Sequence, residues 1–462
     1  MTTRRAPIAP RPLTGAQCTP TAPKMPFLHF RPSSTTKFYA YKCHYFDIVL
    51  ERPSCTLSLT LVVSHLYSAT SIQGSDVDRS DAFSRHSRAT DAADSDISDA
   101  KPVRIIHVVG ARPNFMKAAP VLRALRRFPE VRQALVHTGQ HYDANMSGVF
   151  FAELGMPEPE LNLQVGSGSH AQQTAAIMTR FEPIVLETRP DMVLVYGDVN
   201  STVAAALVCA KLLIPLAHVE AGLRSFDRTM PEEINRVVTD QLADLLLTPS
   251  IDGNENLQRE GVPECRIHFV GNVMIDTLVQ LLPKAQSQLP DELPPQYALI
   301  TMHRPSNVDD STFLRELLQT LDEISREIPV IFPMHPRTRQ RLAELGLSFS
   351  CAARMRLTEP LPYLQFLALQ TRATMVITDS GGIQEETTYL GVPCLTVREN
   401  TERPVTVTIG TNVLVGRNMV RLRDEVKRVL KGGRRPSGVP PLWDGHAAER
   451  VAAAVVNWQP SR

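Results

Sequence analysis

From residue 103 onward, short apolar runs alternate with longer stretches in which apolar residues recur at helical spacing. The apolar runs of the first half are "VRIIHVVG", "QALVHTG", "MVLVYGD", "PLAHVEAG", "LLLTPS" and "IHFVGN". After a proline-rich break at residues 289–296 the rhythm resumes with "YALITMH", "VIFPMH", "TMVITDS" and "PCLTV". Nearly continuous apolar runs are typical of strands buried on both faces, and strands that alternate with helices form parallel sheets. The pattern therefore predicts an α/β protein with two doubly wound domains.

Changes in composition divide the chain into four parts. We expect residues 1–101 to be a disordered or dispensable extension, 102–276 a first domain, 277–443 a second domain, and 444–462 a helical segment that packs back on the first domain. The extension has seven prolines in residues 1–40, no acidic residue before Asp47 and a Ser/Asp-rich run at 75–99, so it can bury little apolar surface. Its basic start is similar to that of an organelle transit peptide, but the prolines oppose the amphipathic helix of such a peptide.

The overall composition narrows the class of partner. The net charge is +1, from 49 basic and 48 acidic residues, so there is no general basic field that would attract nucleic acid. The apolar segment "TLSLTLVV" is too short to cross a bilayer, and we expect no membrane partner. Seven cysteines without a CxxC pair argue against a complete disulfide framework and favour a reducing compartment. Small molecules are the expected ligands.

The segment "TDSGGIQEE" follows the apolar run "TMVI" and places two glycines at an expected helix start. The free N–H groups at the start of a helix bind anions, and Gly381 and Gly382 would let a phosphate approach the backbone closely. Glu385 and Glu386 either have a role at this site or only complement the helix dipole.

Other polar residues follow the expected strands, at the sheet edge where open α/β folds bind their ligands. "GARPNFMK" offers Arg112 and Lys117 as phosphate contacts, although it is neither a GxGxxG nor a Walker motif, so no dinucleotide is indicated. Arg112 would alternatively form a surface ion pair. Asp198 in "YGDVNST" is a candidate acid or a simple helix N-cap.

The segment "MPEEINR" places a carboxylate and a cation on one helical face. Glu232 and Arg236 are spaced i, i+4, and we expect Glu233 to be turned away. This is either an ordinary ion pair or a carboxylate oriented by its own arginine. Upstream, His218 and Glu220 stand two apart in an expected strand, but no third ligand accompanies them, and we predict no metal site.

In the second half, "TMHRPSN" ends one expected strand with His303 and Arg304, and "FPMHPRTR" ends another with His335. A histidine at a strand end is commonly a hydrogen-bonded loop residue. Two such ends with neighbouring arginines instead favour a charged cleft.

Taken together, the motifs resemble those of the non-hydrolysing UDP-N-acetylglucosamine 2-epimerases over residues 103–458. They are, in chain order, "GARPNFMKAAP", "HTGQHYDANM", "VYGDVNST", "HVEAGLRSFDRTMPEEINR", "GNVMIDT", "HRPSNVDD", "TDSGGIQEE" and "TERPVTVTIGTN". The resemblance implies two Rossmann-like domains arranged as in GT-B glycosyltransferases, with the active site in the interdomain cleft. It also implies a cytoplasmic homodimer that supplies UDP-N-acetylmannosamine for cell-envelope polysaccharides and requires neither a cofactor nor a metal.

The same resemblance assigns roles to individual residues. Asp198, Glu220, Glu232 and His303 match the family's active-site groups, and Arg236 would orient Glu232. Seven residues match its UDP-sugar contacts: Arg112, Lys117, Ser380, Gly381, Gly382, Glu386 and Arg403. Some members bind a second UDP-sugar as an activator, through residues that match Gln140, Arg304 and His335.

The reaction that the resemblance implies is elimination of UDP to give 2-acetamidoglucal, followed by readdition of UDP after C2 has been reprotonated on the other face. Three alternatives remain open at this stage. Close relatives epimerise UDP-2,3-diacetamido uronic acids, and the "HTGQHYDANM" region is similar to theirs, whereas "TERP" favours the ordinary substrate. A GT-B glycosyltransferase would transfer the sugar to an acceptor, and a UDP-sugar sensor would bind without turnover.

Overall fold

The computed structural model describes residues 102–140, 151, 153–348, 354–433 and 437–460, together with the short strands β1 (Lys42–Cys43) and β2 (Phe46–Asp47). β1 and β2 pair with each other in antiparallel register. The expectation that residues 1–101 are disordered or dispensable otherwise concerns residues outside the described ranges.

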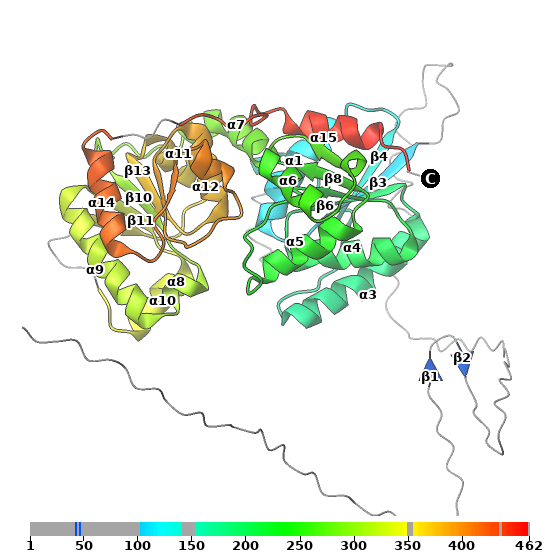
Figure 1. Ribbon diagram of the computed structural model, residues 1–462, viewed down its shortest axis with the longest axis horizontal. Helices are drawn as coiled ribbons and strands as arrows, with labels where there is room; N and C mark the ends of the chain where they lie inside the picture. The colour runs from blue at the N-terminus through cyan, green and yellow to red at the C-terminus, as the bar shows by residue number, and fades with distance from the viewer. Residues whose placement is uncertain are drawn as a thin grey trace, which may run out of the picture. The chain divides into compact units, whose positions relative to one another are not determined.

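The first domain is built on a seven-stranded sheet in which every pair is parallel (Figure 1). In spatial order the strands are β5 (Leu161–Asn162), β4 (Val131–His137), β3 (Val103–Val109), β6 (Met192–Tyr196), β7 (Leu216–Val219), β8 (Leu245–Thr248) and β9 (Ile267–Phe269). The chain order reverses between β3 and β6. In a doubly wound sheet, ligands bind at the carboxyl ends of the strands beside such a reversal.

The second domain repeats this arrangement with six parallel strands. In spatial order they are β12 (Met355–Thr358), β11 (Val330–Pro333), β10 (Ala298–Thr301), β13 (Met375–Thr378), β14 (Cys394–Thr396) and β15 (Asn412–Leu414). Here the reversal lies between β10 and β13. The predicted pair of doubly wound, Rossmann-like domains is therefore confirmed.

Helices cover both faces of each sheet. On the first sheet, α1 (Arg112–Leu125), α7 (Val273–Gln286) and α15 (Ala447–Val456) share one apolar cluster, and α3 (His170–Thr188), α4 (Asn200–Leu212) and α6 (Ile251–Arg259) share another. In Figure 1, α1 and α15 lie on one side of this sheet, and α3 and α4 lie on the other. α5 (Pro231–Leu242) packs beside α4, and the 3₁₀ helix η1 (Glu264–Arg266) precedes β9.

On the second sheet, α9 (Ser311–Glu327), α10 (Pro336–Glu344) and α14 (Met419–Leu430) share one apolar cluster, and α11 (Tyr363–Arg372) and α12 (Gly381–Leu390) contribute to another. Two short helices, α8 (Pro305–Val308) and α13 (Val405–Thr408), lie in loops after β10 and β14. The domain boundary expected between residues 276 and 277 falls inside α7, which contacts α1 as well as α11 and α12. None of the helices formed by the described residues is both long and apolar enough to span a bilayer.

A buried carboxylate on α7 holds the start of α15. Asp276 accepts hydrogen bonds from the backbone N–H groups of Ala447 at 3.1 Å and Ala448 at 2.6 Å, which are among the unpaired donors at that helix start. Burial raises the pKa of Asp276 to about 6. The C-terminal helix is thus tied to α7 by a side-chain cap that is distant in the sequence.

We predict that Asp276→Ala destabilises the protein by about 2 kcal/mol or more, because two buried N–H groups lose their acceptor. Urea unfolding at about pH 8, where this carboxylate is ionised, is the measurement. Glu449→Ala on the same helix is the control, because it removes only exposed ion pairs, with Arg127 and His446, and should cost less than about 1 kcal/mol. Equal losses in the two variants would contradict the capping role.

Candidate active site

Several of the predicted site residues lie beyond the carboxyl ends of strands at or next to the two reversals. In the first domain, α1 begins at Arg112 directly after β3, Asp198 follows β6, and Glu220 follows β7. In the second domain, His303 follows β10, and Ser380 follows β13. These are the positions at which open α/β sheets bind ligands.

Glu220 is a buried carboxylate held by two buried cations. One of its oxygens pairs with Lys117 Nζ, and the other lies 3.2 Å from Arg403 Nη2. Glu220 has a φ of +77°, a left-handed conformation that is rare for a residue with a side chain. It therefore lies just beyond β7 rather than within that strand, where the sequence had placed it. Backbone strain of this kind is concentrated at functional sites.

A glycine makes room for this ion pair. At Gly197, whose φ is +64°, a Cβ atom would lie 2.6 Å from Lys117 Nζ and 3.0 Å from Glu220 Oε2. No residue with a side chain fits there without displacing the pair. The turn between β6 and Asp198 is thus shaped around the charges of Lys117 and Glu220.

Arg403 connects Glu220 to the second domain. Its guanidinium lies 2.7 Å from Glu385 Oε1 and 2.6 Å from Glu402 Oε1, and all these side chains are buried. Burial alone would lower the pKa of Arg403, but the charges of Glu385, Glu402 and Glu220 raise it well above its ordinary value. Arg403 therefore remains a cation that three carboxylates share.

The glycines of "TDSGG" begin α12, as predicted. A Cβ atom at Gly381 would lie 2.7 Å from Arg403 Nη1 and 2.7 Å from Glu402 Oε1, whereas nothing lies within 4 Å of a Cβ at Gly382. Gly381 therefore lets a guanidinium reach the start of the helix, and Gly382 leaves space there. Ser380 is the N-cap residue, and its side chain makes no capping hydrogen bond. Free N–H groups beside a cation are a combination suited to an anion.

The two glutamates after these glycines differ in their partners. Glu385 pairs with Arg403 and accepts a hydrogen bond from Asn272 Nδ2 at 3.0 Å. Glu386 accepts one from the Tyr363 hydroxyl at 2.9 Å, and burial raises the pKa of Glu386 to about 7. The charge of Glu386 also acts on Arg112 at the start of α1. Neither glutamate merely complements the helix dipole.

The prediction that Arg236 pairs with Glu232 on α5 is wrong. Arg236 pairs with Asp198 Oδ2 at 2.5 Å and with Glu233 Oε2 at 2.6 Å, and Glu233 is buried rather than turned away. The reason is that Glu233 also accepts hydrogen bonds at 2.9 Å from the backbone N–H groups of Ser225 and Phe226. Arg236 therefore orients Asp198.

Glu232, which we expected to pair with Arg236, is exposed in the first turn of α5. Its charge acts on Arg304 of the second domain. The i, i+4 spacing allowed a pair between Glu232 and Arg236. Arg236 instead pairs with Glu233 at i, i+3, because contacts with another segment hold Glu233 in place.

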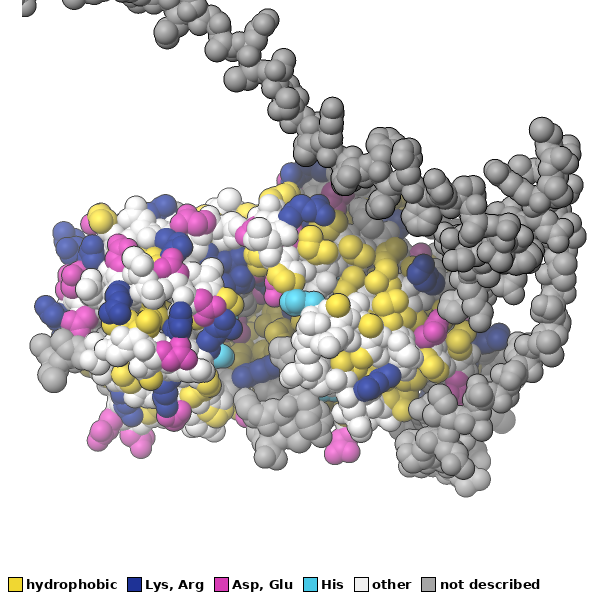
Figure 2. Space-filling view, turned by 90° about the horizontal axis from the view of Figure 1, so that it is seen from below, with side chains coloured by type: hydrophobic (Ala, Val, Ile, Leu, Met, Phe, Trp, Pro, Cys, Tyr) yellow, Lys and Arg dark blue, Asp and Glu magenta, His cyan; other side chains and the backbone are white. Residues whose placement is uncertain are grey.

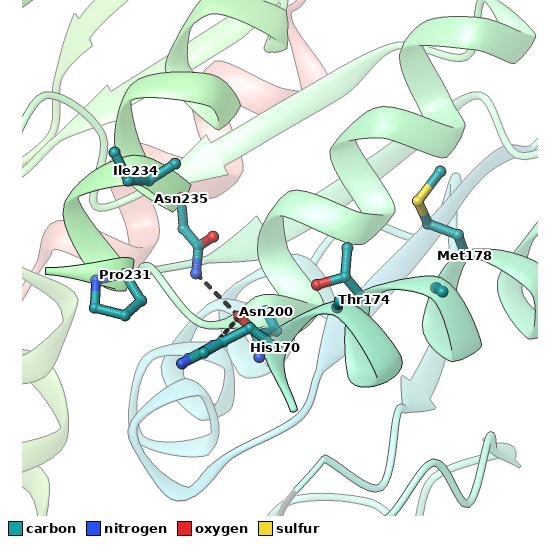
Figure 3. A pocket seen from close by; sticks show the side chains of 9 residues that line it. His170, Thr174, Met178, Asn200, Pro231, Ile234 and Asn235 are labelled. Carbon is teal, nitrogen blue, oxygen red and sulfur yellow. Dashed lines mark hydrogen bonds between the residues drawn. The ribbon is translucent and has the colours of Figure 1, made fainter. Parts of the chain in front are cut away.

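Asn235 supports the loop that carries Asp198. Its Nδ2 donates to the backbone oxygen of Asp198 at 2.9 Å. Figure 3 shows Asn235, Asn200 and His170 pointing toward one another from α5, α4 and α3, beside a largely apolar cavity of about 520 Å³. None of the predicted site residues lines this cavity, whose lining is His170, Ala171, Thr174, Ala175, Met178, Asn200, Pro231, Ile234 and Asn235.

In the second domain, His303 has a buried partner that the sequence analysis missed. Its Nδ1 lies 3.0 Å from Oδ1 of Asp379, which is completely buried. The His335 ring lies 5.8 Å from the His303 ring, between centroids, and burial followed by the charge of His303 lowers the pKa of His335. The pairing of β10 with β13 could have pointed to Asp379, because this pairing places the residues after both strands side by side.

The three residues matched to an activator site are divided between the two domains. Arg304 donates from Nε to the Asp379 backbone oxygen at 2.9 Å and therefore lies beside His303. Gln140 follows β4, and its side-chain oxygen accepts hydrogen bonds from Ser201 N at 3.0 Å and Ser201 Oγ at 2.7 Å. Gln140 thus holds the start of α4 in the first domain. No group of three or more His, Cys, Asp or Glu side chains suited to a metal ion occurs among the residues described.

Comparison with known proteins assigns the chain to a family. The sequence pattern of the UDP-N-acetylglucosamine 2-epimerases matches residues 123–456. The chain belongs to this family. The UDP-N-acetylglucosamine 2-epimerase of Methanocaldococcus jannaschii is 42% identical over 358 residues, which cover 74% of this chain and 96% of that protein. The crystal structure of the M. jannaschii enzyme in complex with UDP-GlcNAc and UDP superimposes with a TM-score of 0.71 at 40% identity, covering 77% of this chain and all of that one.

Another relative in the family is named for a different substrate. The UDP-2,3-diacetamido-2,3-dideoxy-D-glucuronate 2-epimerase of Pseudomonas aeruginosa is 42% identical over 317 residues, which cover 68% of this chain and 88% of that protein. Both relatives are 42% identical to this chain, so sequence identity does not indicate which of the two sugars is its substrate.

We predict that the affinity for UDP depends on the ionisation of Glu386. With its pKa near 7, this carboxyl group is mostly protonated at about pH 6 and mostly ionised at about pH 8. An ionised carboxylate is the stronger acceptor for ribose hydroxyls, so the affinity should rise several-fold across this range. Calorimetry should show a smaller rise for Glu386→Gln, in which the side chain at position 386 no longer titrates. Equal pH dependence in both proteins would place the ribose elsewhere.

Proposed function

We propose that this chain interconverts UDP-N-acetylglucosamine and UDP-N-acetylmannosamine by inverting C2. The observation that carries the proposal is the buried cluster of Lys117, Glu220 and Arg403, which places a carboxylate between two cations at the carboxyl ends of strands from both sheets. A diphosphate needs cations, and proton transfer at an adjacent sugar carbon needs carboxylates. Family membership supports the same reaction.

The nucleotide end of the site lies at the start of α12. Ser380, Gly381 and Gly382 offer a hydroxyl and free N–H groups to the diphosphate, and Arg403 adds charge beside them. Glu386 accepts hydrogen bonds from the ribose. From the first domain, Arg112 and Lys117 complete the binding of the UDP group.

The chemistry proceeds by elimination and readdition. A carboxylate removes the proton from C2, the electrons of that bond form a C1–C2 double bond, and the C1–O bond breaks to release UDP with the bonding electrons. An acid then delivers a proton to the opposite face of C2, and a β-phosphate oxygen of UDP attacks C1. The net change is the configuration at C2, with no redox step and no cofactor.

Different residues serve proton transfer at C2 and contact with the leaving group. Asp198, Glu220 and Glu232 serve proton transfer at C2, and Arg236 holds Asp198 at 2.5 Å. His303 and Arg304 lie beside the loop that begins α12 and act on the departing diphosphate. A second UDP-sugar bound near Gln140, Arg304 and His335 would act as an activator.

We also propose a cytoplasmic homodimer that feeds cell-envelope polysaccharide synthesis. The described cysteines, Cys209, Cys265 and Cys394, are free thiols, as a reducing compartment requires. On the face shown in Figure 2, hydrophobic side chains are gathered over the first domain. Leu213 and Ile234 are among the exposed apolar residues of this domain. An apolar surface of this kind favours association with a second copy.

We predict that epimerisation of UDP-N-acetylglucosamine in D₂O places deuterium at C2 of the product, because the carbon is reprotonated by a group that exchanges with solvent. Proton NMR of the mixture reports both the new sugar and the loss of the C2 proton signal. Offering UDP-2,3-diacetamido-glucuronate in parallel decides between the two sugars. A product that retains the original C2 proton would contradict the mechanism.

Paired substitutions at the two ends of β6 are the control for this assay. Asp198→Asn, at the carboxyl end, should retain UDP binding and lower kcat by about 100-fold or more, because an amide cannot accept the proton. Asp191→Asn, at the amino end, neutralises a structural carboxylate but keeps an oxygen that can accept from the Arg104 N–H group, so it should leave kcat unchanged. Equal effects at the two ends would argue against a chemical role for Asp198.

A further inference from the structure

We propose that Asp379 is a positioning residue that fixes the orientation and the tautomer of His303. This inference rests on the proposed function, in which His303 acts on the departing diphosphate. It extends that function by assigning a role to a buried carboxylate that touches none of the reacting atoms.

The topology of the second sheet brings the two residues together. β10 and β13 are adjacent, with Thr301 paired to Thr378, and they flank the reversal of strand order. Asp379 directly follows β13, and His303 lies two residues beyond β10. The residue after Asp379 begins the expected phosphate loop, so a single carboxylate connects that loop to the histidine.

The Asp379 carboxylate is held in place independently of the imidazole. Its Oδ2 accepts hydrogen bonds from His303 N at 3.1 Å, Arg304 N at 2.9 Å and Asn307 Nδ2 at 3.2 Å. Asn307 in turn donates to Val397 O at 2.9 Å. Because these bonds orient the whole carboxylate, Oδ1 points at His303 Nδ1, 3.0 Å away. The ring is therefore directed by a fixed acceptor.

An ionised carboxylate can only accept hydrogen bonds, so Nδ1 must carry the hydrogen. The lone pair of the neutral ring is then on Nε2, away from the buried Asp379, while the ring itself is 39% exposed. Burial alone would raise the pKa of Asp379, but the hydrogen bond and charge of His303 and the loop N–H groups lower it, which keeps the carboxylate ionised. Nε2 is thus the nitrogen that meets a ligand.

The competing explanation is that Asp379 only holds the loop together. A double-mutant cycle separates the two roles, because a residue that acts through His303 has nothing left to orient once the histidine is replaced. We expect Asp379→Asn to lower kcat by about 100-fold, with KM changed by less than about threefold. In a His303→Asn background the same substitution should lower kcat less than about threefold further. A full additional loss in that background would overturn the proposal.

The ring tautomer is a second readout that does not require turnover. In the ¹⁵N-histidine-labelled protein, the His303 signals are identified among the 13 histidines by their absence from His303→Asn. We expect the neutral ring to carry its hydrogen on Nδ1 in the wild type, and the population of this tautomer to fall in Asp379→Asn. A wild-type ring protonated on Nε2 would overturn the proposal even if the variant did not fold. If the proposed epimerase activity failed, this result would still stand.

Asp310→Asn is the matched control. Asp310 caps α9 in the same domain by accepting from Thr312 N at 3.0 Å and Phe313 N at 3.1 Å, and asparagine caps a helix about as well. We expect this variant to keep the wild-type kcat and the wild-type His303 tautomer. A changed tautomer there would mean that the signal does not report on Asp379, and the proposal would fall.

Discussion

The Glu220 carboxylate lies between Lys117 and Arg403, and the arrangement of the site depends on this ion-pair cluster. A buried charge without a partner is strongly destabilising, so each member fixes the positions of the others. The backbone has adapted to the cluster, with glycines at positions 197 and 381 where any Cβ atom would collide with it. Because Arg403 comes from the second domain, the same ion pairs that hold Glu220 also connect the two domains.

Two similar sheets bring chemically different groups to this cluster. The reversal between β3 and β6 supplies a lysine and carboxylates, whereas the reversal between β10 and β13 supplies a histidine and a helix start with free N–H groups. A nucleotide diphosphate is suited to the second set, and proton transfer at a sugar carbon is suited to the first. In the proposed reaction, the different roles of the two domains follow from the residues that end the strands of each sheet.

The sequence predicted the features that depend on local pattern. Apolar runs located the strands, and the paired glycines located the start of α12, because both signals lie within a few residues. Which glutamate pairs with Arg236 was less predictable from the sequence. Glu233 is held in place by the backbone N–H groups of residues 225 and 226, which lie on a different segment of the chain. Asp379 was missed for the same reason: its role depends on the pairing of β10 with β13. The predicted boundary between residues 276 and 277 lies inside α7, a helix that contacts helices of both domains.

In the proposed mechanism, both halves of the site act on one bond, between C1 of the sugar and the β-phosphate oxygen. Positional isotope exchange tests it directly, with UDP-N-acetylglucosamine labelled with oxygen-18 in that bridging position. If the bond breaks and re-forms while UDP stays bound, phosphorus NMR will show the label spreading into the non-bridging β-phosphate oxygens as epimerisation proceeds. Epimerised product that keeps all of its label in the bridge would contradict the account.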